Sequence, residues 1–203
     1  MNYGDLKSHF NDLLNRSDIT TALTECFIDQ GIARIQRQLR TPMSERVLNI
    51  TITGQTESLT LPSDFMEIIS LYMNEYELER VSMRKYREVA HTAVAGKPRM
   101  FVRQAEKLLL YPQPTSGTLS LYYHGEFPTL SADSDSNVLT NAAPDLIIYG
   151  ALTFASDYYL DARAEQFEAK FTQFLTELQE QANDQELQGG TQSVLPAYSF
   201  QDR

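Results

Sequence analysis

Apolar residues recur at helical spacing in the first forty residues of the chain. One stripe consists of Leu6, Phe10, Leu13 and Leu14, and a second consists of Leu23, Phe27, Ile28, Ile32, Ile35 and Leu39. Spacings of three and four residues place each set on one face of an amphipathic helix. Ser17-Asp18 is a helix-start signal between the stripes, and Pro42 stops the second helix soon after Arg40. The segment therefore predicts a helical hairpin.

From Arg46 the apolar period changes to two, as in β-strands. Residues 48–52 alternate between apolar and polar, and Gly54-Gln55 is a turn signal that leads to a second alternating run at residues 59–61. These two runs predict a β-hairpin with one apolar face.

The pattern of short alternating runs continues to residue 124. Two further hairpins are predicted, with strands over residues 66–72 and 76–81 and over residues 99–103 and 107–111. A short helix is predicted over residues 82–90, and a last strand over residues 118–124. We expect about six or seven short antiparallel strands in this part of the chain.

Helical patterning returns after a polar segment, residues 131–137, which predicts an exposed loop. Pro144 and Asp145 suit the first turn of a helix that runs to Tyr159. A heptad-like seam then predicts a further long helix, and its residues are Leu160, Ala164, Phe167, Phe171, Phe174 and Leu178. Past Gln181 the periodicity is lost.

The order of elements predicts an α+β fold. We expect an up-and-down bundle of about four helices that carries an inserted block of short antiparallel strands, because terminal helices with one apolar face must bury those faces together. The predicted domain covers residues 1–182, with helices in residues 1–45 and 140–182 and the β insertion at residues 46–130. Residues 183–203 are expected to form an extended C-terminal arm.

Composition limits the class of protein. The chain has 203 residues, of which 42% are hydrophobic, and this is enough to build a core. The longest apolar run, Leu146 to Ala155, is half of the ~20 residues that span a bilayer, and the first residues lack a signal sequence. We therefore expect a soluble protein made in the cytoplasm, with no membrane partner. The single cysteine, Cys26, is expected to be a buried small hydrophobe.

Charge is unevenly distributed. The net charge is −10, and residues 131–186 hold 11 acidic residues against two basic ones. A local basic stretch contains Arg84, Lys85, Arg87, Lys97, Arg99 and Arg103. We expect it to contact the acidic segment of another subunit, with DNA binding as an alternative that the overall acidity disfavours. The same two interpretations, a subunit contact or DNA binding, apply to one edge of the second helix, which is formed by Arg34, Arg37 and Arg40.

Motifs for metal, cofactor and nucleophile chemistry are missing from the sequence. The three histidines, His9, His91 and His124, lie in different predicted elements without metal-site spacing. Gly96-Lys97-Pro98 lacks the glycine spacing of a phosphate-binding loop. We therefore expect no metal and no cofactor.

One acidic pattern permits an enzyme hypothesis. Glu75, Glu77 and Glu79 alternate along a predicted hairpin, so neighbouring carboxylates would share one face at ~7 Å, as in inverting glycosidases. This spacing permits a glycosidase, such as one that cleaves cell-wall peptidoglycan, as an alternative function. A solvated hairpin face explains the same pattern without catalysis, and nothing nearby would raise the pKa of one carboxyl above the others.

A succession of short motifs resembles the head-to-tail adaptor proteins of tailed bacteriophages over roughly residues 1–182. These motifs are Asn2-Tyr3-Gly4-Asp5-Leu6, Leu14-Asn15-Arg16, Ile32-Ala33-Arg34-Ile35, Leu39-Arg40, Leu61-Pro62-Ser63-Asp64-Phe65, Pro98-Arg99 and Pro144-Asp145-Leu146-Ile147-Ile148-Tyr149-Gly150-Ala151-Leu152. Their order along the chain, followed by the phenylalanine seam, carries the resemblance.

The resemblance implies a structural, non-enzymatic protein at the head–tail neck of the virion. It implies a ring of about twelve copies below the portal that extends the DNA channel, through which DNA passes without specific binding. The implied partners are the portal protein, further copies of the chain, and downstream tail or nozzle proteins, with tail fibres in tube-type adaptors. In this family a C-terminal arm grips the portal, and by position the anchors here are Leu187, Val194, Leu195, Tyr198 and Phe200.

Overall fold

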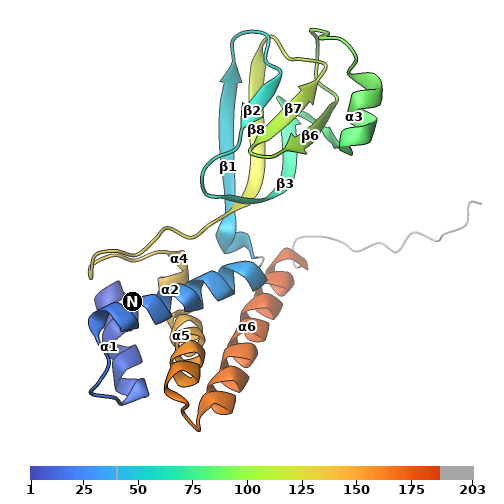
Figure 1. Cartoon of the computed structure of the whole chain (residues 1–203). Coiled ribbons are helices and arrows are strands. Elements are labelled where there is room, and N and C mark those ends of the chain that lie inside the picture. The colour runs from blue at the N-terminus through green and yellow to red at the C-terminus, as the bar shows by residue number, and fades with distance from the viewer. Residues whose placement is uncertain (40, 188–203) are drawn as a thin grey trace, which may run out of the picture. The chain divides into compact units, whose positions relative to one another are not determined.

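The computed structural model describes residues 1–39 and 41–187, and it divides into two compact units (Figure 1). Residues 1–4 and 42–142 form the first, which we call the β unit. Of the described residues, 5–39, 41 and 143–187 form the second, the helical unit. The β unit is inserted in sequence between two helical segments, so the predicted α+β class is confirmed.

The helical unit contains α1 (Tyr3–Leu14), α2 (Thr21–Gln38), α5 (Pro144–Tyr159) and α6 (Ala164–Leu187). The two N-terminal helices and the start of α5 at Pro144 are confirmed. The predicted start of α2 at Ser17-Asp18 is wrong, because Thr20 caps this helix instead. Its hydroxyl oxygen accepts a hydrogen bond of 3.3 Å from the Leu23 N–H, which satisfies one of the free amides of the first turn.

Helices α2 and α5 approach each other backbone to backbone. A Cβ atom added to Gly31 of α2 would lie 2.8 Å from the backbone nitrogen of Ala151 on α5. A Cβ on Gly150 would lie 3.4 Å from the Gly31 Cα and 3.1 Å from the Phe171 ring of α6. Glycine is needed at this crossing because any side chain would push the two helix axes apart.

The arrangement of the helices differs from a simple up-and-down bundle. Figure 1 shows α5 and α6 running side by side in opposite directions, while α2 crosses α5 steeply. The predicted four-helix bundle is therefore not confirmed. Apolar periodicity specifies which face of a helix is buried. The crossing angle depends on the sizes of the residues at the contact, and here two glycines let the backbones meet.

The phenylalanine seam is confirmed from Ala164 onward and wrong at its first residue. Phe167 and Phe171 are buried on α6. Leu160 is 90% exposed, because α5 ends at Tyr159 and Leu160 adopts the left-handed conformation (φ 53°) before α6 begins. It therefore does not share the α6 stripe.

Two further details of the helical unit depart from the sequence predictions. Cys26 is exposed rather than buried, because the buried face of α2 is formed by Phe27, Ile28 and Ile35. Helix α6 continues to Leu187, past the point near Gln181 where the apolar pattern ends.

The β unit consists of two four-stranded sheets. One sheet has the order β1 (Glu45–Ile52), β8 (Gly117–Gly125), β3 (Phe65–Met73) and β4 (Tyr76–Glu77). The other has the order β2 (Ser58–Thr60), β7 (Lys107–Tyr111), β6 (Met100–Gln104) and β5 (Glu79–Arg80). The pairs are antiparallel except for β5 with β6, which is parallel.

One of the three predicted hairpins is confirmed in full, and a second is confirmed only in part. The predicted strand over residues 76–81 is divided into β4, which pairs with β3, and β5, which pairs with β6 in the other sheet. Strands β3 and β4 are joined at Asn74, and β6 and β7 are joined at Ala105. Both turn residues have positive φ (54° and 53°), which tight hairpin turns require. The hairpin predicted around Gly54-Gln55 is wrong, because β1 pairs along its whole length with β8 and β2 pairs with β7 in the other sheet.

The two sheets of the β unit share one apolar core. Its completely buried members are Leu71, Leu108, Leu110, Leu119 and Leu121. Strand β2, in the same sheet as β7, contributes Leu59 to this core. The alternation in the sequence therefore predicts the buried faces correctly while leaving the pairing partner of each strand open.

Two short helices complete the β unit. Helix α3 (Met83–Val89) is the predicted one, capped by Ser82 and anchored by the buried Tyr86. Helix α4 (Val138–Ala142) follows the polar loop and was not predicted. In the described part of the chain, no helix combines the length and the low polarity required to cross a bilayer.

The glycine crossing leads to a stability prediction. We expect Gly31→Leu to lower the free energy of unfolding by about 3 kcal/mol or more, because the new side chain must displace the α5 backbone. Urea denaturation followed by circular dichroism measures the change. Gln30→Leu is the matched control, since Gln30 is exposed on the same helix and should shift stability by about 0.5 kcal/mol at most. Equal free energies of unfolding for the two variants would contradict the close backbone contact between α2 and α5 at Gly31.

Candidate assembly interface

The basic stretch spreads over α3, β6 and the segment before β6. Two of its cations have acidic partners: Arg84 pairs with Glu88 at 3.0 Å, and Lys85 pairs with Glu79 at 2.6 Å. Arg87 is exposed on α3. These pairs lie on the surface, where each contributes little to stability, so the cations remain accessible to a partner.

The remaining cations of the stretch are separated by β6. Arg103 lies at the far end of the strand, 5.0 Å from the ring centre of Phe65, and its Nε donates to the Ala105 carbonyl at 3.2 Å. Arg99 lies just before the strand and is exposed. Since a strand rises ~3.3 Å per residue, four residues put these two arginines ~13 Å apart. Arg99 therefore lies on the surface near α3, whereas Arg103 lies at the other end of β6, near Phe65.

Arg99 borders a hollow of about 380 Å³ in the β unit, which we call the basic hollow. It is lined by Val89, Lys97, Arg99, Met100, Tyr111 and Pro112. The ammonium group of Lys97 lies over the ring of Tyr76, 2.8 Å from its centre. None of the described residues that line the hollow is acidic. The hollow thus combines an apolar floor with two cations, which suits an apolar group flanked by carboxylates.

The arginines of α2 have different environments. The Arg34 guanidinium donates to Thr153 Oγ1 at 3.1 Å and to the Glu168 carboxylate at 2.8 Å, and it lies 4.1 Å from the centre of the Phe171 ring. The hydrogen bond from Arg34 lowers the pKa of Glu168. Arg37 is exposed on the same helix. Arg34 therefore holds α2, α5 and α6 of its own unit together, whereas Arg37 is accessible to a partner.

Several predicted residues fall outside the described part of the chain. They are Arg40, Val194, Leu195, Tyr198 and Phe200. The fifth predicted anchor of the arm, Leu187, is the last residue of α6. The arm assignment stays a prediction.

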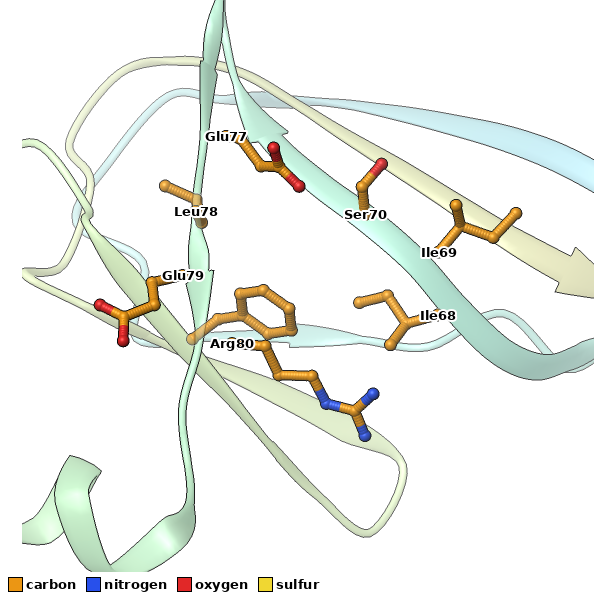
Figure 2. Close-up of a pocket in the computed structure, with 8 residues that line it drawn as sticks. Ile68, Ile69, Ser70, Glu77, Leu78, Glu79 and Arg80 are labelled. Carbon is orange, nitrogen blue, oxygen red and sulfur yellow. The ribbon is translucent and has the colours of Figure 1, made fainter. Parts of the chain in front are cut away.

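The three candidate catalytic carboxylates do not converge. Glu75 lies in the β3–β4 turn, Glu77 in β4 and Glu79 in β5, which belong to different sheets. Figure 2 shows the carboxylates of Glu77 and Glu79 pointing to opposite sides of the chain that links these strands. Inverting glycosidases need two carboxyl groups that face each other across about 6.5–9.5 Å, and this pair does not provide them.

The pocket in Figure 2 lies where the chain passes from one sheet to the other. It has a volume of about 340 Å³, and its apolar lining includes Ile68, Leu78 and Phe101. Arg80 and Glu77 lie at its edge. The exposed Glu79 of this lining is paired with Lys85, and the other polar residues of the lining are Ser70, Glu77 and Arg80.

A second surface feature lies in the helical unit, at the turn between α5 and α6. We call residues 157–165 the helical corner. Arg163 donates to the carbonyls of Leu13 (3.1 Å) and Leu14 (2.9 Å), which are the last carbonyls of α1. It also pairs with Asp161 at 2.7 Å, and this hydrogen bond lowers the pKa of Asp161 to about 2. The guanidinium thus ties the corner to the C-terminal end of α1.

The helical corner presents apolar side chains to solvent. Tyr158 is 62% exposed and Leu160 is 90% exposed. This feature was not predicted, because helical periodicity assigned Leu160 to the buried seam. The signal for it in the sequence is the pair of charged residues that follows, Asp161 and Arg163.

The comparison with known families agrees with the resemblance found in the sequence. The family model described as SU10 adaptor protein matches residues 1–194, which covers both units. No curated protein matches the chain.

The geometry of Arg34 leads to a second prediction. We expect Arg34→Ala to lower the free energy of unfolding by about 1–2 kcal/mol, because it removes the contacts to Thr153, Glu168 and Phe171 together. Arg37→Ala, on the same helix and exposed, should change it by about 0.5 kcal/mol at most. Thermal or urea unfolding of both variants measures the difference. If Arg37→Ala proved the more destabilising, the assignment of Arg34 to the helical unit would be wrong.

Proposed function

The chain belongs to the SU10 adaptor protein family, and from this membership we propose that it forms a ring at the neck of the virion, between the portal and the tail. As a phage adaptor it is a structural protein of the virion, and its partners are portal and tail proteins in general. In the proposed ring, about twelve copies surround the DNA channel and extend it from the portal toward the tail.

The distribution of charge and apolar surface supports self-assembly. The β unit has a basic hollow, and the helical unit has most of the acids of residues 131–186. Two different, complementary surfaces on one chain favour head-to-tail contacts, which form a ring when the rotation from one copy to the next closes on itself. The contacts of Arg34 within its own unit leave Arg37, Arg87 and Arg99 as the better candidates for subunit contacts.

Acidic residues on the second half of α6 support passage of DNA. Glu177, Glu180 and Asp184 are exposed there. Repeated around a ring, such carboxylates repel the phosphates of passing DNA and discourage adhesion. We propose that this part of α6 lines or borders the channel, and that DNA is not bound specifically.

The C-terminal arm is the proposed contact with the portal. Its apolar anchors, Leu187, Val194, Leu195, Tyr198 and Phe200, are spaced along a segment rich in Gln, Ser and Gly. Such a segment can order on binding and bury its spaced hydrophobes in grooves of a partner. Downstream tail or nozzle proteins, and tail fibres where the adaptor is of the tube type, would bind the other side of the ring.

The enzyme alternative is not proposed further. The three glutamates that suggested it lie in a turn and in two different sheets, and two of them point apart (Figure 2). The single observation that carries the adaptor function is the family match over residues 1–194.

The arm leads to a third prediction. We expect the variant Tyr198→Ala/Phe200→Ala to lose capture by the purified portal protein of the same phage by about tenfold or more, because it removes two aromatic anchors. Ser199→Ala/Gln201→Ala is the matched control and should bind as the unaltered chain does. Pull-down with immobilised portal measures capture, and negative-stain images show whether rings form.

The outcomes separate the two parts of the proposal. Rings on the portal with both variants would show that the arm does not make the contact. Failure of the unaltered chain to form rings, with or without portal, would contradict the ring adaptor itself.

A further inference from the structure

Leu160 and Tyr158 of the helical corner are the two most exposed large hydrophobic residues in the described part of the chain, at 90% and 62%. Single exposed hydrophobes are common on protein surfaces. Here, however, the two are only two residues apart, in the last turn of α5 and at its C-cap. Burying a leucine side chain completely contributes about 1.5–3 kcal/mol, so this corner offers a partner a substantial apolar contact.

The backbone holds the corner in one conformation. Leu160 has φ 53° and ψ 43°, a left-handed conformation that costs a residue other than glycine about 1–2 kcal/mol. The N–H of Asp161 donates to the Ser156 carbonyl at 2.8 Å, and Arg163 ties the turn to the end of α1. A side chain presented from a rigid turn loses little entropy on binding, which raises the affinity of its contacts.

The charge around Leu160 is negative. Asp157 and Glu165 are exposed on either side of the turn. The carboxylate of Asp161 and the guanidinium of Arg163 neutralise each other at 2.7 Å. A partner surface for this corner therefore needs an apolar recess with cations at its rim.

The basic hollow of the β unit has those properties. Its floor includes Met100, Tyr111 and Pro112, and Lys97 and Arg99 supply the positive charge. Its volume of about 380 Å³ accommodates one leucine side chain. Val89, which is 44% exposed, extends the apolar floor toward α3. Leu160 is almost fully exposed, so it does not occupy the hollow of its own chain.

We propose that the helical corner of one copy docks into the basic hollow of the next copy. Leu160 inserts into the hollow, and Asp157 and Glu165 face Lys97 and Arg99. The two surfaces differ, so the contact is head-to-tail and propagates from copy to copy until the ring closes. This inference rests on the proposed ring and specifies which surfaces join its subunits.

Crosslinking tests the contact directly. In a Cys26→Ser background, a chain with Leu160→Cys and a second chain with Met100→Cys are mixed with purified portal and exposed to a mild oxidant. We expect covalent dimers under denaturing, non-reducing conditions, and a ladder of higher species when both cysteines are in one chain. A matched control pairs Leu160→Cys with Val47→Cys, since Val47 is exposed on β1 and outside the hollow. This control should give no dimer.

Charge reversal gives an independent measurement. Lys97→Glu/Arg99→Glu should reduce ring formation by about tenfold or more, and so should Asp157→Lys/Glu165→Lys. Mixing the two variants should restore ring formation with alternating copies, because the unaltered corner of the first variant meets the unaltered hollow of the second, and the two reversed surfaces also carry opposite charges. Circular dichroism and thermal unfolding show whether each variant folds, which is expected because all four positions are on the surface.

The outcomes distinguish this inference from the proposed function. If the unaltered chain forms rings but no crosslink appears and both charge variants assemble normally, the docking is wrong while the ring adaptor stands. A crosslink from Leu160→Cys to the portal would also overturn it, by showing that the corner serves another partner. If the unaltered chain forms no rings, both proposals fall.

Discussion

The helical unit depends on the close contact between Gly31 of α2 and Gly150 of α5. Since neither residue has a side chain, the two backbones touch, and the Phe171 ring of α6 packs against Gly150 as well. Arg34, one turn beyond Gly31, lies over the same phenylalanine ring. The crossing therefore positions three helices at once. It also joins the two halves of the chain that flank residues 42–142, so the helical unit can form only after that long loop is closed.

Sequence patterns predicted the local elements well and the non-local pairings poorly. Spacing of Leu6, Phe10 and Leu14 was sufficient for α1, because all three are completely buried on one stripe. The hairpin at Gly54-Gln55 was wrong, because β1 has eight residues that match β8 throughout, whereas β2 has only three. A turn signal competes with long-range pairing, and the longer ladder prevails.

The sequence predicted that residues 84–103 are rich in basic residues, but it did not predict which of them share one surface. The stretch from Arg84 to Arg103 is basic in sequence, yet β6 separates Arg103 from the other cations. The basic hollow also needs Tyr111 and Pro112, which come from the end of β7 and the residue after it. Leu160 followed the helical spacing and still lies outside the core, since a turn of the backbone changes the direction of a side chain without changing its place in the sequence.

The acidic residues of the C-terminal part of the chain have different roles. Asp161 and Glu168 are bound to Arg163 and Arg34, and they fix the helical unit. In the proposed ring, Asp157 and Glu165 select a basic partner surface, and the acids on the second half of α6 keep DNA from adhering. In that proposed ring the chain has to bind proteins tightly while DNA moves past it. Negative charge serves both requirements, because it attracts the cations of a protein partner and repels phosphates, and the apolar contacts then supply the affinity that screened charges alone cannot.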